Sequence, residues 1–327
     1  MTMTPPPSLP ARDGAELLSG WRYRAVLSSV FLAVASYLGF AFWSGWQDIV
    51  HAVGKVGFLG VATALSLSLI NYGLRFIRWQ IYLQAMNHTI PWWPSLKIYL
   101  AGFALTTTPG KAGEALRGVL LKRWEIPYSK SLAAFLSERL SDLLAVVLLA
   151  LFGLLVYPAA QPLIAVAAIG VLVTLLVVAN QGLLERLHAM IQGRSRIRTS
   201  LGYLLQILLQ TRHCHAPAVL LRATGLSLIA WTAEALAFYL ILRWMELEIS
   251  LTFAVFIYAA SMLAGALSFM PGGLGGAEAV MVALLLWKGA GNAEAIAATV
   301  LIRMSTLWFA VGIGVFFYLL ARRAIKL

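Results

Sequence analysis

Eight charged side chains lie within or at the edges of long apolar segments of the sequence. A charge near the centre of a bilayer costs about 2.5–3.5 kcal/mol on insertion scales. Eight such charges facing lipid would cost roughly 20–28 kcal/mol, more than the ~5–15 kcal/mol by which folded proteins are stable. They must therefore pair, lie near the membrane interface, or face a polar cavity. The eight residues are Glu114, Arg117, Glu138, Arg139, Asp142, Glu234, Glu278 and Arg303.

Arginines and glycines in these segments are suited to binding an anion. A guanidinium group matches phosphate oxygens with two parallel hydrogen bonds. The glycine-rich stretches at 110–113 and 272–275 each precede a short predicted helix, whose free backbone N–H groups attract an anion. Together they indicate a site for a lipid with a phosphate headgroup. The arginines are Arg75, Arg78, Arg117, Arg139 and Arg303.

The glutamates near these arginines have three candidate roles. They could bind a cationic group, couple protons, or hold the arginines in place. Glu114 and Arg117 are three residues apart and share a helix face, as do Arg139 and Asp142. Structural ion pairing is therefore the alternative to a binding cavity. The glutamates are Glu114, Glu138, Glu234 and Glu278.

The composition places these charges in a membrane protein. The chain has 327 residues, of which 61% are hydrophobic and 12% are charged, and its mean hydropathy is +0.83. Soluble proteins are about 45–50% apolar and about 25% charged. A soluble enzyme, a nucleic-acid reader and a disordered scaffold are therefore excluded. The net charge of +12 fits basic cytoplasmic loops rather than nucleic-acid binding. We expect a multi-pass protein of the cytoplasmic (inner) membrane.

Apolar runs of about 20 residues predict the membrane spans. We expect a disordered cytoplasmic tail at 1–20 and a single transmembrane domain at 21–327. Clusters of Lys and Arg place both termini and the linker at about 181–218 in the cytoplasm, and the linker alternates apolar and basic residues like an interfacial amphipathic helix. The fold class is thus an all-α polytopic membrane protein. Its six expected spans are 25–43, 56–82, 131–157, 160–180, 219–242 and 293–320.

Two further apolar segments are interrupted. Residues 95–127 contain T-T-T-P-G-K-A-G, and residues 250–289 contain F-M-P-G-G-L-G-G. The spans before and after each segment place both of its ends on the same side of the membrane. Each segment is therefore expected to be a re-entrant broken-helix hairpin, and the two hairpins enter from opposite sides. Broken backbone at membrane depth is tolerated only where it is buried in protein or lines a watery cavity. The alternative is that residues 252–270 form a full span.

The two breaks also indicate an internal repeat. Arg139 follows the first break's proline by 30 residues, and Arg303 follows the second break's proline by 32. Upstream, Arg78-Trp79 matches Arg243-Trp244. Repeat 1 at about 56–157 and repeat 2 at about 219–320 would then be inverted-topology repeats, which are common in secondary transporters; chance similarity is the alternative. The matched break residues are Pro109, Gly110, Gly113 and Glu114 with Pro271, Gly272, Gly275 and Glu278.

These motifs resemble the transmembrane domain of the lysylphosphatidylglycerol synthase family, which are flippase-like membrane proteins. The matching stretches are N-Y-G-L-R-F-I-R-W at 71–79, P-G-K-A-G-E-A-L-R at 109–117, E-R-L-S-D at 138–142, P-G-G-L-G-G-A-E at 271–278, and Arg303. The resemblance implies translocation of an aminoacylated phospholipid or a polyprenyl-linked sugar. The family's aminoacyl transfer resides in a separate soluble domain, and the linker at 181–218 is too short for one. The chain is thus expected to be a stand-alone member without synthase activity.

The expected function is a lipid flippase that works by alternating access around a central charged cavity. The alternatives are an intramembrane enzyme using paired acids, although H-E-x-x-H, G-x-S-x-G and Walker motifs are absent, and a small-solute or ion carrier. The expected partner is a membrane lipid, with room for a homo-oligomer and an upstream lipid-modifying enzyme; no cofactor, metal or nucleic acid is expected. The expected site residues are Arg75, Arg78, Pro109, Gly110, Gly113, Glu114, Arg117, Glu138, Arg139, Asp142, Glu234, Pro271, Gly272, Gly275, Glu278 and Arg303.

Overall fold

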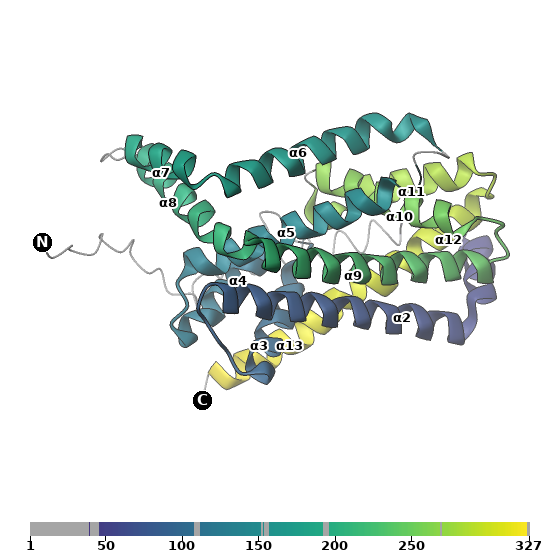
Figure 1. The fold of residues 1–327 in the computed structure, drawn as a ribbon. Coiled ribbons are helices and arrows are strands. Elements are labelled where there is room, and N and C mark those ends of the chain that lie inside the picture. The colour runs from purple at the N-terminus through teal and green to yellow at the C-terminus, as the bar shows by residue number, and fades with distance from the viewer. Residues whose placement is uncertain are drawn as a thin grey trace, which may run out of the picture.

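The computed structural model describes residues 39, 46–107, 112–151, 153, 157–191, 196–268 and 270–325. Within these residues all regular structure is helical and there is no strand. Two long helices, α2 (Trp46–Ala85) and α9 (Pro217–Trp244), lie side by side and run in opposite directions through the bundle (Figure 1). The predicted all-α class is confirmed. The predicted tail at 1–20 lies outside the described residues.

Four helical stretches are long and apolar enough to cross a membrane. They are Val53–Ala85, Pro158–Ala179, Pro217–Trp244 and Asn292–Leu320. They coincide with four of the six predicted spans. A fifth predicted span, at 131–157, contains α5 (Tyr128–Leu151), a 24-residue helix that is less apolar because it carries Glu138, Arg139 and Asp142. The remaining predicted span, at 25–43, lies outside the described residues except for Gly39.

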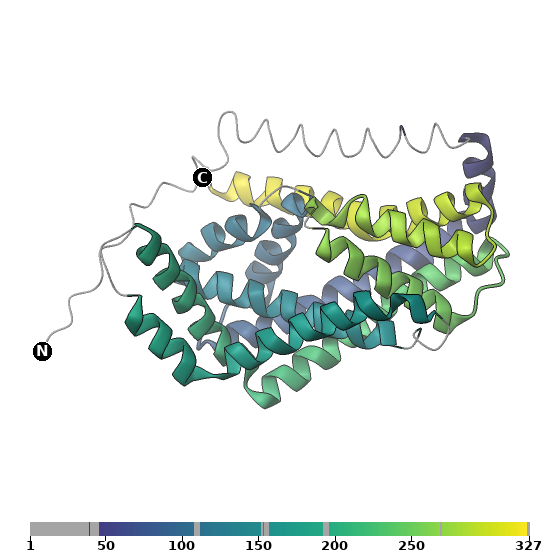
Figure 2. The same ribbon diagram turned by 90° about the horizontal axis from the view of Figure 1, so that it is seen from above.

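The predicted linker helix is instead a pair of helices. After α6 (Gln161–Ala179), the Asn180 side chain accepts a hydrogen bond from the Leu183 N–H and starts α7 (Gln181–Met190). The chain then continues into α8 (Arg196–Thr211) and a short 3₁₀ turn, η6 (Arg212–His215). Helix α7 packs against α8, which packs against α5. The pair lies at the same end of the bundle as the C-terminal end of α13 (Figures 1 and 2).

Both interrupted segments fold as a helix, a break and a second helix. The first consists of α3 (Trp92–Ala101), η2 (Gly102–Leu105) and α4 (Ala112–Leu121). The second consists of α10 (Leu251–Leu267), η7 (Pro271–Gly273) and α11 (Gly276–Trp287). In each hairpin the two helices pack against each other, and the hairpins lie at opposite ends of the bundle (Figure 1). The 17 residues of α10 extend only about 25 Å, which suits a hairpin arm better than a complete span.

Corresponding helices of the two halves begin at similar offsets along the sequence. Helices α3 and α10 begin at Trp92 and Leu251, 159 residues apart. Helices α4 and α11 begin 164 residues apart, at Ala112 and Gly276, and so do α5 and α12 (Asn292–Arg303). The distance from the start of the first hairpin helix to the start of the second is therefore five residues longer in the second hairpin. This register aligns Glu114 with Glu278 and Arg139 with Arg303.

The predicted match of Arg78-Trp79 with Arg243-Trp244 does not agree with this register. Arg78 lies in the interior of α2 and is fully buried, whereas Arg243 is exposed in the last turn of α9. The two helices end instead at equivalent left-handed residues, Asn87 and Glu246, which are 159 positions apart. By this register the equivalent of Arg78 is Ala237, so the upstream part of the sequence match is wrong.

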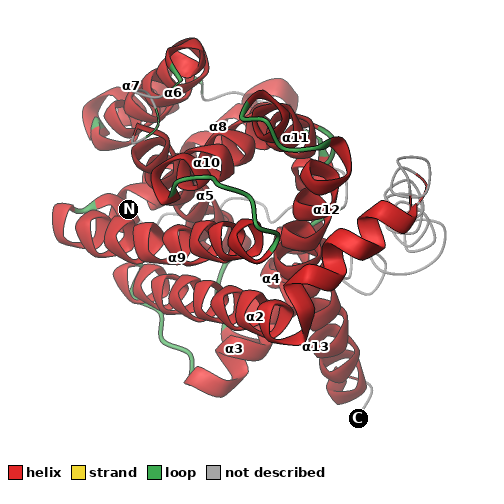
Figure 3. Cartoon of the chain, turned by 90° about the vertical axis from the view of Figure 1, so that its right-hand side faces the viewer, coloured by secondary structure: helices red, strands yellow, loops and turns green. Residues whose placement is uncertain are grey.

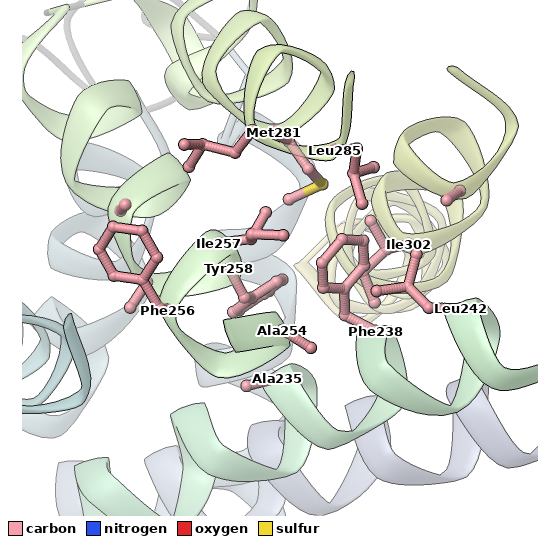
Figure 4. Packing of buried hydrophobic residues seen from close by; sticks show 14 of the residues in the cluster. Ala235, Phe238, Leu242, Ala254, Phe256, Ile257, Tyr258, Met281, Leu285 and Ile302 are labelled. Atoms are coloured by element: carbon pink, nitrogen blue, oxygen red, sulfur yellow. The ribbon is translucent and has the colours of Figure 1, made fainter. Parts of the chain in front are cut away.

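The two halves pack crosswise. Helix α5 of the first half packs against α9 and α10 of the second. Reciprocally, α12 packs against α2, and α13 (Phe309–Ile325) packs against α3 and η2, as the end view shows (Figure 3). The apolar core of the second half gathers Phe238, Tyr258, Met281 and Ile302 from α9 to α12 (Figure 4). Each hairpin is thus held by the last helix of the opposite half.

Candidate functional site

Asp142 on α5 is the centre of a buried charge cluster that joins three helices. Its Oδ2 accepts a hydrogen bond from Arg75 Nη2 at 3.1 Å, and its Oδ1 accepts one from Arg78 Nη1 at 2.5 Å. Trp231 of α9 donates its indole N–H to the same Oδ1 at 3.0 Å. Two guanidinium groups therefore share one carboxylate, which leaves the cluster with a net positive charge.

The predicted neighbour of Asp142 on its own helix is not its ion-pair partner. The Asp142 carboxylate reaches α2, while the Arg139 guanidinium lies over the Phe135 ring at 5.0 Å. Arg78 also donates to the Ser227 hydroxyl of α9. Because Arg75 and Arg78 are three residues apart on one face of α2, both can reach Asp142 at the same time.

A second cluster surrounds Arg117, which lies on α4 of the first hairpin. Its Nη1 donates to Glu138 Oε2 at 2.8 Å, and its guanidinium lies over the rings of Tyr99 and Trp79, at 4.5 and 5.2 Å from their centroids. Arg117 and Glu138 are both buried. The prediction paired Arg117 with Glu114 instead; Glu114 lies in the first turn of α4, next to Gly113, and its side chain is outside the described positions.

Gly102 makes room for Arg117. A Cβ atom at this position would lie 2.4 Å from Arg117 Nε, which is closer than atoms can approach. We expect Gly102→Ala to lower the free energy of unfolding by ~1–3 kcal/mol, because the added methyl group must displace the Arg117 side chain from the aromatic rings that it contacts. Thermal unfolding in detergent measures this. The control is Gly73→Ala: Gly73 is exposed on helix α2 and a Cβ there has nothing within 4 Å, so the variant should be at least as stable as the parent. Equal stability of both variants would contradict the expectation.

The third cluster lies at the second break. Arg303 Nε donates to Glu278 Oε1 at 2.6 Å, and Arg303 Nη2 donates to the carbonyl oxygen of Gly272 at 2.9 Å. Glu278 Oε2 accepts a hydrogen bond from the Gly275 N–H at 2.7 Å. The predicted grouping of glycines, Glu278 and Arg303 is thus present. However, one of the N–H groups predicted to be open to an anion, that of Gly275, is bonded to the carboxylate of Glu278.

Local backbone geometry supports this third cluster. Gly272, Gly273 and Gly275 have positive φ angles of 65°, 68° and 83°, which only glycine adopts readily. Directly after Arg303 the helix widens into a π-helical turn, η8 (Met304–Trp308). In that turn the Thr306 carbonyl accepts a hydrogen bond from the Tyr72 hydroxyl of α2. Such π-turns are frequent at functional sites.

The second break lies close to the last described residue before the first break. A Cβ atom on Gly272 would lie 3.3 Å from Cγ2 of Thr107, the last described residue before the first break's Pro109 and Gly110. Pro109 and Gly110 themselves lie outside the described residues, and so does the side chain of Pro271. Met270 and Gly275, which flank the second turn, remain exposed. The glycine turn therefore stays accessible although it contacts the opposite hairpin.

Several buried polar atoms in these clusters have no hydrogen-bond partner among the described residues. An anion or water could accept from the arginine nitrogens and the hydroxyl group, whereas the carboxylate oxygen needs a donor such as water. The atoms are Arg75 Nε, Arg78 Nε and Nη2, Glu138 Oε1 and Thr107 Oγ1. No set of three or more His, Cys, Asp or Glu side chains in the described part of the chain is placed to hold a metal ion.

Sequence reasoning missed the neutral partners of these charges. Ser227, Trp231 and Glu234 lie at positions i, i+4 and i+7 of α9 and so share one helix face. Glu234 accepts a hydrogen bond from the Tyr258 hydroxyl of α10 at 2.5 Å. Their helical spacing from Glu234 was the feature of the sequence that could have identified Ser227 and Trp231 as site residues. Thr107 and Tyr258 carry no comparable signal, since hydroxyl and aromatic residues are common in apolar helices.

The region over which this chain resembles known proteins includes all three clusters. A family model described as "Lysylphosphatidylglycerol synthase TM region" matches residues 26–314. Two UPF0104 membrane proteins of Methanothermobacter thermautotrophicus are 25% and 23% identical over 314 and 302 residues, covering 88% and 83% of this chain and 90% and 88% of the relatives. The UPF0104 membrane protein PH1989 of Pyrococcus horikoshii is 22% identical over 314 residues, covering 87% of this chain and 94% of that protein. The likeness therefore extends over nearly the whole chain.

Proposed function

Because the chain belongs to the lysylphosphatidylglycerol synthase transmembrane-region family, we propose that this multi-pass membrane protein moves a lipid with an anionic headgroup across the inner membrane. The headgroup crosses at the junction of the two broken hairpins, while the acyl or prenyl chains stay in the bilayer. The substrate is a phospholipid, an aminoacyl-phospholipid or a polyprenyl-phosphate-linked sugar. The mechanism is alternating access between the two halves of the molecule.

The observation that best supports this proposal is the set of hydrogen bonds made by Arg303. Its guanidinium bridges the Glu278 carboxylate and the Gly272 carbonyl, at a turn that contacts Thr107 of the opposite hairpin. A phosphodiester headgroup carries the same single negative charge as a carboxylate and also presents paired oxygens to a guanidinium group. We infer that the headgroup phosphate replaces Glu278 on Arg303, and that Glu278 holds the site in readiness when no lipid is bound.

Two further features support a pathway through the bundle. The Arg75–Arg78–Asp142 cluster has one more positive than negative group, so it attracts an anion. The similar offsets of the helix ends, 159 and 164 residues, the opposite directions of α2 and α9, and the crosswise association of the halves fit inverted-topology repeats, in which substrates bind between discontinuous helices. In this proposal α5 and residues 25–43 complete six spans, the hairpins are re-entrant, and both termini are cytoplasmic.

Reconstitution into liposomes tests the proposal. Headgroup-labelled phosphatidylglycerol, its lysyl ester and a polyprenyl-phosphate sugar are each placed in one leaflet, and loss of label from that leaflet is followed. We expect protein-dependent movement of at least one of them, with the lipid mass unchanged by mass spectrometry. A changed mass would favour an intramembrane enzyme. No movement of any of the three would contradict the proposal.

A further inference from the structure

Glu234 differs from the other carboxylates whose contacts the structure describes inside the bundle. Glu138, Asp142 and Glu278 each form an ion pair with an arginine, at 2.8, 2.5 and 2.6 Å respectively. Among the described residues, Glu234 has no Lys or Arg nitrogen within 4 Å, and its hydrogen-bond donor is the neutral Tyr258 hydroxyl at 2.5 Å. It is only 5% exposed and lies within a candidate membrane span.

An unpaired carboxylate at this depth is costly. Transfer of an isolated charge from water into a low-dielectric interior carries a large penalty, and the group commonly takes up a proton instead. A neutral carboxylic acid avoids that penalty while keeping its contact with Tyr258. In membrane proteins, buried carboxyl groups of this kind commonly take part in proton relays.

Charged and titratable neighbours surround Glu234 from each helix that packs against it. Arg75 is the important one, because it interacts electrostatically with both Asp142 and Glu234, and its buried Nε has no partner among the described residues. By the 159-residue register, Arg75 and Glu234 occupy equivalent positions in the two halves. Among the described residues these neighbours are Tyr72 and Arg75 from α2, Asp142 from α5, Tyr258 from α10 and Arg303 from α12.

We propose that Glu234 is a proton-binding site whose protonation is coupled to movement of the lipid headgroup. When Glu234 is protonated, Arg75 is held by Asp142 alone, as in the observed arrangement. When the proton leaves, the carboxylate attracts Arg75, and the Arg75–Arg78–Asp142 cluster loosens. One O–H bond forms and breaks, and water supplies and accepts the proton. This inference rests on the proposed function, since it names the ion that drives it.

The first test reads the proton directly and needs no transport. Infrared difference spectra of the full-length protein in lipid vesicles are recorded while the pH is changed. We expect a carbonyl band of a protonated carboxylic acid that titrates with pH in the parent and is absent in Glu234→Gln. Tyr258→Phe should shift the band's frequency, because the carbonyl loses its hydrogen-bond donor. The control is Glu246→Gln, whose carboxylate lies at the end of α9 and is 80% exposed; it should keep the band. A Glu234→Gln spectrum identical to that of the parent would overturn the inference.

The second test measures coupling in proteoliposomes of phosphatidylglycerol and phosphatidylethanolamine. A pH difference is imposed across the membrane, and the rate of headgroup movement is followed in both directions. Because one titrating group changes its occupancy by about tenfold per pH unit away from its midpoint, the parent and Glu246→Gln should respond by several-fold, and Glu234→Gln by less than about twofold. A Glu234→Gln response equal to that of the parent overturns the coupling. Lipid movement absent from the parent itself would instead contradict the proposed function, and the infrared titration would still decide whether Glu234 binds a proton.

Discussion

Replacing Arg303 with glutamine should reduce headgroup movement by about 100-fold or more. Arg303 donates one hydrogen bond to the Glu278 carboxylate and one to the Gly272 carbonyl oxygen. In the proposal, the lipid phosphate replaces Glu278 as the acceptor of the first of these bonds. Hydrogen bonds from charged groups are worth about 1.5–3 kcal/mol each, and each 1.4 kcal/mol is about a factor of ten in rate or affinity. The measurement is the initial rate of label loss in proteoliposomes.

The variant should remain folded, because the Glu278 carboxylate that loses its counter-charge is 14% exposed and still accepts a hydrogen bond from the Gly275 N–H. Arg303→Lys separates charge from geometry: it keeps the positive charge but loses the planar fork, so an intermediate rate is expected. The matched control is Arg243→Gln, which removes an exposed arginine at the end of α9. A parental rate in Arg303→Gln, with normal thermal stability, would remove Arg303 from the pathway.

The sequence alone predicted the third cluster well because its members are tied to one break. Gly272, Gly275 and Glu278 lie close together in the sequence. The match of Arg139 with Arg303 in the two halves added Arg303 to them. What remained hidden was the direction of the hydrogen bonds. A glutamate at the third position of a helix caps its own N-terminus, so α11 carries its own anion.

The partners of Asp142 could not be predicted in the same way. Spacing along the sequence ranks only neighbours on one helix, and it favoured Arg139. Asp142 instead pairs with residues 67 and 64 positions away, on α2. Which helix faces α5 depends on how all the helices pack together, which the apolar pattern of one segment does not encode.

Upstream of the breaks, the sequence match between the two halves differs from the register of the helix ends. The Arg-Trp dipeptides suggested a match, yet the helix ends are set by backbone turns. In α2 the His88 N–H bonds to the Leu83 carbonyl, and in α9 the Leu247 N–H bonds to the Leu242 carbonyl. The residues at positive φ there are Asn87 and Glu246 rather than glycine, so these turns left little trace in the sequence.

Replacing Asp142 with asparagine should lower the free energy of unfolding by about 3–5 kcal/mol. The substitution preserves side-chain volume and an oxygen acceptor for Trp231, but it leaves the buried guanidinium groups of Arg75 and Arg78 without their shared counter-charge. Removing one partner of a buried ion pair typically costs this much, because the remaining charge is uncompensated. Chemical or thermal unfolding in detergent measures the change. The control is Glu246→Gln, whose ion pair with Lys55 lies at the surface and should contribute at most about 1 kcal/mol.

A second substitution shows whether charge or shape causes the loss. Arg75→Gln combined with Asp142→Asn removes one of the two uncompensated cations, so the double variant should be more stable than Asp142→Asn alone. Residues in one ion-pair network commonly show interaction energies of about 0.5–3 kcal/mol in such cycles. Additive effects of the two substitutions would mean that Arg75 is neutralised by another group. In that case Glu234 would be its counter-charge, and the Arg75–Asp142 contact would not depend on the protonation of Glu234.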